Sequence, residues 1–123
     1  MLLDKAERMH RQFFELLASP TAAREPAWEP PVNIVATNGE LDIFVALPGA
    51  DPQDIAVRII AGGVQINARV SPPALAYQSK LLRLEIPYGS MRRRIELPPG
   101  PYRIAERRHA NGYLYLRLME AHS

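Results

Sequence analysis

The sequence of 123 residues has the length of one domain and carries 15 basic and 13 acidic side chains, a formal charge of +2. It contains no cysteine, which excludes disulfides, a thiol nucleophile and thiolate-bound metal. Hydrophobic residues make up 47% of the chain, enough for a packed core. No apolar run approaches the roughly 20 residues of a membrane helix. Charges from Asp4 to Arg8 interrupt any apolar run at the start of the sequence, so we expect a cytoplasmic protein without a secretory signal.

Residues 2–18 are expected to form an amphipathic helix because apolar residues recur at helical spacing. This apolar face consists of Leu2, Ala6, Met9, Phe13, Leu16 and Leu17, with Phe14 on its flank. Such a face either packs on its own domain or contacts other chains. Residues 20–31 contain four prolines and are expected to be an extended linker. We therefore interpret residues 1–27 as a helical arm with its linker.

From residue 32 the hydrophobic period changes to two, which is typical of half-buried strands. Turn residues at Asn38-Gly39, Pro48-Gly49 and Gly62-Gly63 separate these strands. The expected strands lie at 32–36, 41–46, 55–60 and 64–68. Short strands at this spacing predict an all-β, antiparallel sandwich or barrel.

Residues 71–89 form a connection that is too long for a hairpin turn, and long loops in compact domains are usually functional or contact a partner. Within it, Leu82, Leu84 and Ile86 alternate with polar residues. This alternation predicts a short strand at residues 82–86.

The strand predicted at residues 91–97 places Arg93 on the same face as apolar residues, whereas Arg92 and Arg94 share the opposite face. A guanidinium on an apolar face needs an ion-pair or hydrogen-bond partner unless it reaches water at the rim of the sheet. Two further strands follow, the first beginning at Tyr102. Its alternation suggests Ile104 and Glu106 on one face with Tyr102.

No motif of known enzyme chemistry is present: the sequence lacks a glycine-rich phosphate loop, an HExxH motif and a GxSxG elbow. The three histidines lie on separate segments, and Asp51 and Asp54 are better interpreted as turn residues. We therefore expect no catalytic residue, no metal and no cofactor.

Residues 65–123 carry ten basic and four acidic groups, so nucleic-acid binding is one interpretation of this half. The candidate residues are Arg92, Arg94, Arg103, Arg107 and Arg108, with Tyr102, Tyr113 and Tyr115 as stacking faces. Because the arginine run divides between two faces of its strand, we give this interpretation less weight. The same imbalance fits a homo-oligomer whose acidic and basic parts meet.

Four motifs in register resemble the α-crystallin domain of small heat-shock proteins. Residues 28–34 resemble its opening motif W-x-P-x-V-D-I, and residues 47–49 its L-P-G turn. Residues 89–98 resemble G-x-F-x-R-x-F-x-L-P, and residues 111–114 resemble N-G-V-L. The resemblance covers residues 28–118.

The resemblance implies an immunoglobulin-like β-sandwich and a stress-response chaperone that holds unfolded or partly unfolded proteins without ATP. It implies a homodimer in which residues 82–86 cross to the partner's strand at 32–36, with Arg93 at the family's characteristic arginine. The expected dimer interface comprises Val32, Ile34, Leu82, Leu84, Ile86 and Arg93. The expected client-binding residues are Phe13, Phe14, Leu16 and Leu17 of the arm and Val57, Ile59 and Ile104 of the sandwich.

Residues 119–123 carry no I-x-I motif of the kind with which family members dock onto neighbouring dimers. We therefore expect a dimer or small oligomer rather than a large shell, and no membrane partner. The alternative is an interaction module, without chaperone activity of its own, that co-assembles with a tail-bearing relative.

Overall fold

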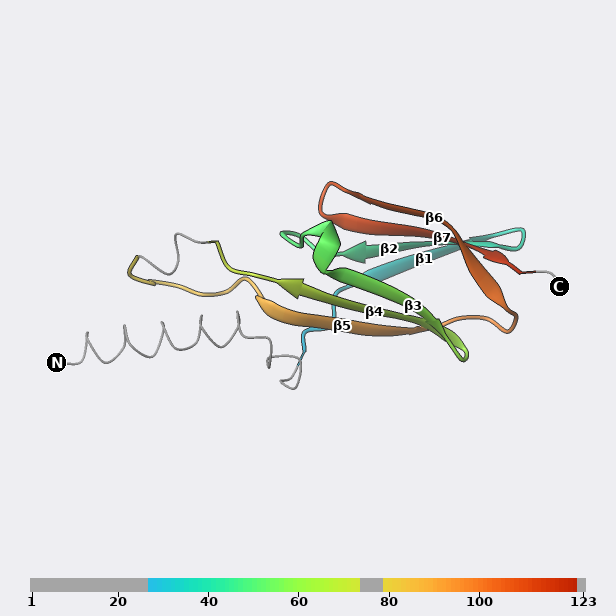
Figure 1. Cartoon of the computed structure of the whole chain (residues 1–123), viewed down its shortest axis with the longest axis horizontal. Coiled ribbons are helices and arrows are strands. Elements are labelled where there is room, and N and C mark those ends of the chain that lie inside the picture. Colours follow the sequence, from blue (N-terminus) through green and yellow to red (C-terminus); the bar gives the residue numbers. More distant parts are fainter. Residues whose placement is uncertain (1–26, 74–78, 122–123) are drawn as a thin grey trace.

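The computed structural model describes residues 27–73 and 79–121, whose arrangement is shown in Figure 1. Alternating apolar and polar side chains form strands here because successive residues of a strand point to opposite faces of a sheet. The elements of the described residues are β1 (Val32–Thr37), β2 (Glu40–Ala46), the short 3-10 helix η2 (Pro52–Asp54), β3 (Ile55–Ile60), β4 (Gly63–Val70), β5 (Gly89–Glu96), β6 (Tyr102–Ala110) and β7 (Tyr113–Glu120).

The strands form two antiparallel sheets. The larger sheet has the strand order β1-β2-β7-β6, and the smaller sheet has the order β3-β4-β5. In Figure 1 they form two layers, with β3, β4 and β5 on one side and β2, β6 and β7 on the other. The predicted fold class, an antiparallel β-sandwich, is confirmed. The expected helix at 2–18 lies outside the described residues.

Two hairpins of the larger sheet have the turns that their sequences predict. Asn38 and Gly39 have φ angles of 39° and 79°, and Asn111 and Gly112 have φ angles of 54° and 79°. Positive φ at both central residues defines a turn whose twist matches the right-handed twist of the flanking strands. Asparagine and glycine are the residues that adopt positive φ most readily. These turns fix the register of β1 against β2 and of β6 against β7.

The core fills the space between the two sheets. Strands β2, β4 and β7 turn alternate apolar side chains inward, and among the described residues no polar or charged residue is buried with them. The largest side chains that are less than 2% exposed are Ile43, Val45, Leu47, Val64, Ile66, Leu114, Leu116 and Leu118. Burial of this apolar area is the main stabilising contribution to the sandwich.

Strand β6 contains an irregularity that the sequence alternation did not reveal. Ile104 pairs with Leu118 and Glu106 with Arg117, so Ala105 has no partner in the ladder. This extra residue reverses the alternation, as in a β-bulge. The expectation that Glu106 shares a face with Ile104 is therefore wrong: Glu106 points outward, and Arg107 points toward the space between the sheets.

The segment before β1 lies along the outer edge of β5. Trp28 forms a parallel bridge with Met91, in which Trp28 N donates to Ser90 O and Arg92 N donates to Trp28 O, both at 2.9 Å. The indole nitrogen of Trp28 also donates to the main-chain oxygen of Tyr88 at 3.2 Å. One edge of the smaller sheet is thus partly covered by the chain itself.

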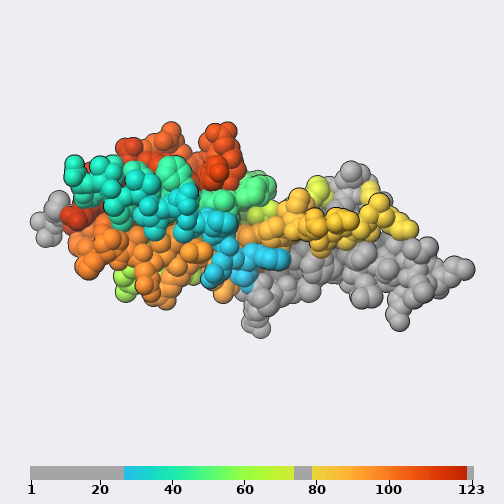
Figure 2. Space-filling model, turned by 180° about the vertical axis from the view of Figure 1, so that it is seen from behind, coloured from blue at the N-terminus to red at the C-terminus, as the bar shows by residue number. Residues whose placement is uncertain are grey.

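The described part of the connection between β4 and β5 forms no strand. The strand predicted at residues 82–86 is therefore not formed within this chain, because no strand of the described residues pairs with it. Residues 79–88, yellow in Figures 1 and 2, extend away from the sandwich instead.

Candidate functional site

The first candidate surface lies where the edges of the two sheets meet at β3 and β6. Each of these strands pairs on one side only, β3 with β4 and β6 with β7. The guanidinium of Arg107 in β6 donates from Nη2 to the main-chain oxygen of Ile55 in β3 at 2.7 Å, so the two edges are close neighbours. We call this surface the β3–β6 edge.

The three residues of the sandwich that were expected to bind clients lie on the β3–β6 edge. Val57 and Ile59 pair with buried Ile66 and Val64, and Ile104 pairs with buried Leu118. Val57 is half-buried against the core, whereas Ile59 is 41% exposed and Ile104 is 37% exposed. Their side chains therefore face the layer between the sheets but keep apolar area in contact with water.

The second candidate surface consists of β1 and the extended segment at 79–88. In the part of the chain that the structure describes, β1 pairs with β2 alone, and no described strand bonds to its other edge. Ile34 of β1 is 41% exposed and Val32 is half-buried. On the extended segment, Leu82 is 87% exposed and Ile86 is 60% exposed, whereas Leu84 is half-buried.

Arg93 lies on the inner face of β5, as its position between Met91 and Ile95 predicts. It pairs across the ladder with buried Ile66 and is itself half-buried. The expected ion-pair partner is not found among the residues that the structure describes. Over the same described residues, no side-chain hydrogen bond of Arg93 is found either.

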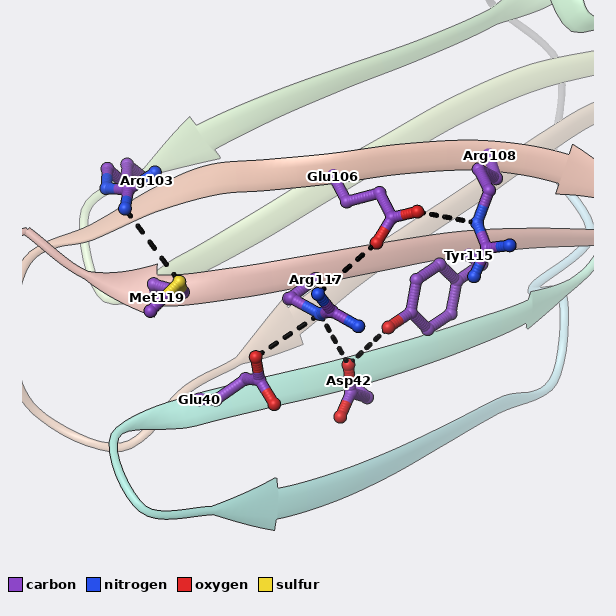
Figure 3. A network of polar contacts seen from close by, with 8 residues as sticks. All are labelled: Glu40, Asp42, Arg103, Glu106, Arg108, Tyr115, Arg117 and Met119. Atoms are coloured by element: carbon purple, nitrogen blue, oxygen red, sulfur yellow. Dashed lines mark hydrogen bonds and ion pairs between the residues drawn. The ribbon is translucent and has the colours of Figure 1, made fainter.

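Charged and aromatic side chains form a network on the outer face of the larger sheet (Figure 3). Arg117 of β7 lies at its centre, with Nε 3.2 Å from Glu40 and 3.6 Å from Asp42, and Nη1 3.5 Å from Glu106. Glu106 also pairs with Arg108 at 2.8 Å. These contacts tie β2, β7 and β6 together, and at this exposure each contributes little alone.

Tyr115 joins the aromatic part of this face to the network. Its hydroxyl donates to Asp42 Oδ1 at 2.5 Å, and its ring lies 5.1 Å from the ring of Phe44. The guanidinium of Arg108 lies 4.9 Å from the centre of the same ring. The pKa of Tyr115 is raised, mainly by the hydrogen bond to Asp42 and to a smaller extent by desolvation. The pKa of Arg117 is raised as well, mainly by its contact with Tyr115. The network thus has a structural role, holding β2, β6 and β7 together, and is not an acid–base pair.

The structure does not bring the expected nucleic-acid-binding residues together. Arg92 and Arg94 belong to the smaller sheet, whereas the other three arginines belong to β6. Arg107 is engaged with Ile55, Arg108 with Glu106, and Arg103 donates to Met119 Sδ at 3.8 Å. These five arginines are therefore divided between the two sheets rather than gathered in one groove.

The remaining expectations concern the arm, metals and membranes. The client-binding candidates Phe13, Phe14, Leu16 and Leu17 lie outside the described residues. Over residues 27–73 and 79–121, no group of three or more histidine, aspartate or glutamate side chains could hold a metal ion. No helix in this part of the chain is long and apolar enough to cross a membrane.

Comparison with known proteins identifies the fold. A scan against family models finds no match, and a search of curated proteins by sequence finds none. Solved structures do match, among them hspA from Xanthomonas axonopodis, with 28% identity, a TM-score of 0.66 and coverage of 77% of this chain and 96% of that chain. A small heat-shock protein from Xylella fastidiosa matches with 26% identity, a TM-score of 0.66 and coverage of 80% and 91%. HSP18.5 from E. histolytica shares the fold at 21% identity, with a TM-score of 0.66 and coverage of 79% and 93%.

The two-sheet architecture is thus that of an α-crystallin domain, as the four sequence motifs indicated. The chain is therefore similar to the small heat-shock protein family, of which the matching structures are members. Members of this family are ATP-independent chaperones and not enzymes, and a chaperone-type role follows for this chain.

Proposed function

We propose that this protein is an ATP-independent holdase that binds unfolded or partly unfolded proteins and suppresses their aggregation. The observation that carries the proposal is apolar side-chain area exposed beside unpaired strand edges on an α-crystallin sandwich. Burial of apolar area drives such binding without nucleotide hydrolysis. An unpaired edge also offers main-chain hydrogen bonds to an extended client segment.

Within the described residues, the β3–β6 edge is our candidate for client capture. Ile59 and Ile104 supply exposed apolar area from opposite sheets, and Val57 is partly buried and packs against the core. An extended segment that lies along β3 would cover both isoleucines while using the free edge of that strand. The arm residues Phe13, Phe14, Leu16 and Leu17 remain a second proposed capture surface.

We further propose a homodimer formed by strand exchange. Residues 82–86 have no strand partner among the described residues of their chain and expose Leu82 and Ile86, which suits addition to the free edge of β1 in a second copy. This addition would cover Leu82 and Ile86 together with the exposed side of Ile34 on β1. Arg93 is proposed to lie near this interface.

Light scattering of a heated client tests the holdase proposal. At equal mass the protein should suppress the client's scattering in the absence of ATP. The variants Ile59→Asp and Ile104→Asp should suppress it less, because a charge on the edge opposes burial of apolar client residues. Arg83→Gln, on the extended segment and away from the β3–β6 edge, serves as a matched surface control. Scattering unchanged by the wild-type protein would contradict the proposal.

Co-assembly with a relative is the second candidate function, since free edges accept strands of another chain as well as strands of the same chain. It predicts weak protection by the protein alone and tight incorporation into the relative's oligomers. Mixing the two proteins and measuring the mass of the assemblies distinguishes it from a self-sufficient holdase.

A further inference from the structure

The outer face of the smaller sheet carries four arginines, although these residues are far apart in sequence. They point outward because their neighbours along each strand, such as Ile66 of β4 and Met91 of β5, are buried in the core. The cross-strand rows of this face are Arg58, Gln65 and Arg94; then Ala56, Asn67 and Arg92; then Arg69 and Ser90. We call this surface the arginine face.

The positive charge of the arginine face is poorly balanced. Glu96 of β5 is the acidic residue among its strands, and Asp54 of η2 lies at its rim. The ion pairs found among the described residues join side chains of the larger sheet or of the 79–88 segment, and none includes Arg58, Arg69 or Arg94. In contrast, the larger sheet alternates acids and bases on its outer face (Figure 3). The arginine face is thus suited to an external anion.

Arg69 lines a shallow hollow in the arginine face and has a guanidinium nitrogen that lacks an acceptor among the described residues. The hollow has a volume of about 340 Å³, and Asp54, Asn67, Arg69 and Arg92 are among the residues that line it. Nη2 of Arg69 is buried without a hydrogen-bond partner in the described structure. A buried donor without a partner is costly, and a carboxylate in the hollow would satisfy it after a small rotation of the side chain.

We propose that the arginine face binds an extended, acidic segment of another polypeptide. Arginine forms two parallel hydrogen bonds with a carboxylate, which lysine cannot do. Same-face residues of β5 such as Arg92 and Arg94 repeat at about 6.6 to 6.8 Å, which is also the repeat of alternate side chains in an extended peptide. The amide of Gln65 lies between Arg58 and Arg94, and the amide of Asn67 lies beside Arg92, so both can bond the peptide's main chain.

An acidic peptide fits this face better than a nucleic acid does. Proteins that bind single strands combine positive charge with aromatic rings on which bases stack. The sequences of β3, β4 and β5 contain no aromatic residue. Binding at the arginine face needs none of the apolar residues of the β3–β6 edge, so this inference stands apart from holdase activity.

Fluorescence anisotropy of a labelled peptide with alternating glutamate and threonine tests the inference on the full chain. The peptide should bind, and its affinity should fall as salt rises toward physiological strength. The double variant R58Q/R94Q should weaken binding about threefold to tenfold, since two exposed charge pairs are lost. The double variant R83Q/R103Q removes the same charge from other surfaces and should bind as the wild type does.

Four results would overturn the inference: no binding of the peptide, equal loss in both double variants, tighter binding of a single-stranded oligonucleotide, or an oligomer that dissociates when Arg58 and Arg94 are replaced. The last would assign the face to contacts between copies of this chain. Because both positions are exposed, thermal unfolding of R58Q/R94Q should match the wild type. Protection of an uncharged apolar client should also be unchanged, so failure here and failure of the holdase proposal are distinguishable.

Discussion

Arg107 of β6 and Ile55 of β3 connect the two sheets at their edges, through a hydrogen bond of 2.7 Å from the guanidinium to the main-chain oxygen. The bond exists because the irregularity after Ile104 turns Arg107 toward the interior side of its strand. It satisfies a carbonyl at the start of an edge strand and joins β6 to β3.

Replacing Arg107 with alanine should destabilise the sandwich. A part-buried hydrogen bond from a charged donor contributes about 1.5 to 3 kcal/mol, and Arg107→Ala should lower the free energy of unfolding by about that amount. Urea denaturation measures the loss, with Arg103→Ala as a control on the outer face of the same strand. Equal stability of Arg107→Ala and the wild type would show that this bond does not hold the edges together.

Tyr115 should ionise at higher pH than an ordinary tyrosine. Its pKa is raised, first by the hydrogen bond to Asp42, so the folded state favours the neutral phenol. The resulting stabilisation is present below the ordinary pKa of about 10 and is lost as the pH rises through the raised value.

A spectroscopic titration of the phenolate tests this shift, with Tyr115→Phe identifying the signal of Tyr115 among the tyrosines. Asp42→Ala should move that signal toward the ordinary pKa, because the largest cause of the shift is removed. The account of the network fails if Tyr115 titrates at or below the ordinary value in the wild type.

Gly63 should not tolerate alanine, although its φ angle is not positive. A Cβ at this position would overlap the main-chain oxygen of Ile95 on the neighbouring strand, and neither backbone can move without breaking the ladder. Gly63→Ala should cost about 1 to 3 kcal/mol or more, as overpacking does. Gly62→Ala is the matched control: it has open space but a φ of 79°, so about 1 kcal/mol is expected. Thermal unfolding that ranks Gly62→Ala as the more harmful change would contradict this geometry.

The proposed strand exchange predicts a specific loss of dimer. Leu82→Glu and Ile86→Glu place charges on the most exposed apolar residues of the extended segment, and multi-angle light scattering at micromolar concentration should then report a monomer. Arg83→Gln should leave the dimer intact, since Arg83 is a polar residue of the segment that is paired with Glu85. A wild-type protein that is monodisperse and monomeric would contradict strand exchange.

The sandwich could be predicted from the sequence because apolar alternation and Asn-Gly turns fix strands and hairpins locally. The orientation of Arg93 could be predicted from the same alternation of side chains along the strand. The orientation of Glu106 did not, because the extra residue at Ala105 leaves no mark in the apolar pattern. The bridge between Trp28 and Met91 and the bond between Arg107 and Ile55 join distant segments, so only the assembled fold reveals them.

The arginine face was concealed for a different reason. In the sequence, Arg92, Arg93 and Arg94 form one run, whereas Arg58 and Arg69 are isolated. Because successive residues of a strand point to opposite sides, Arg93 does not belong to this face. The pairing of β3, β4 and β5 places Arg58 and Arg69 on the same face as Arg92 and Arg94. Strand pairing between distant segments is therefore what gathers this charge.

Recovery of client–protein complexes after heating is the decisive test of holdase activity. A client should be heated with the full chain in the absence of nucleotide, and the soluble fraction separated by size exclusion with light scattering. The account predicts soluble complexes that contain both proteins, and fewer of them with Ile59→Asp and Ile104→Asp. Client found entirely in the pellet, with this protein eluting at its own unchanged mass, would contradict the account.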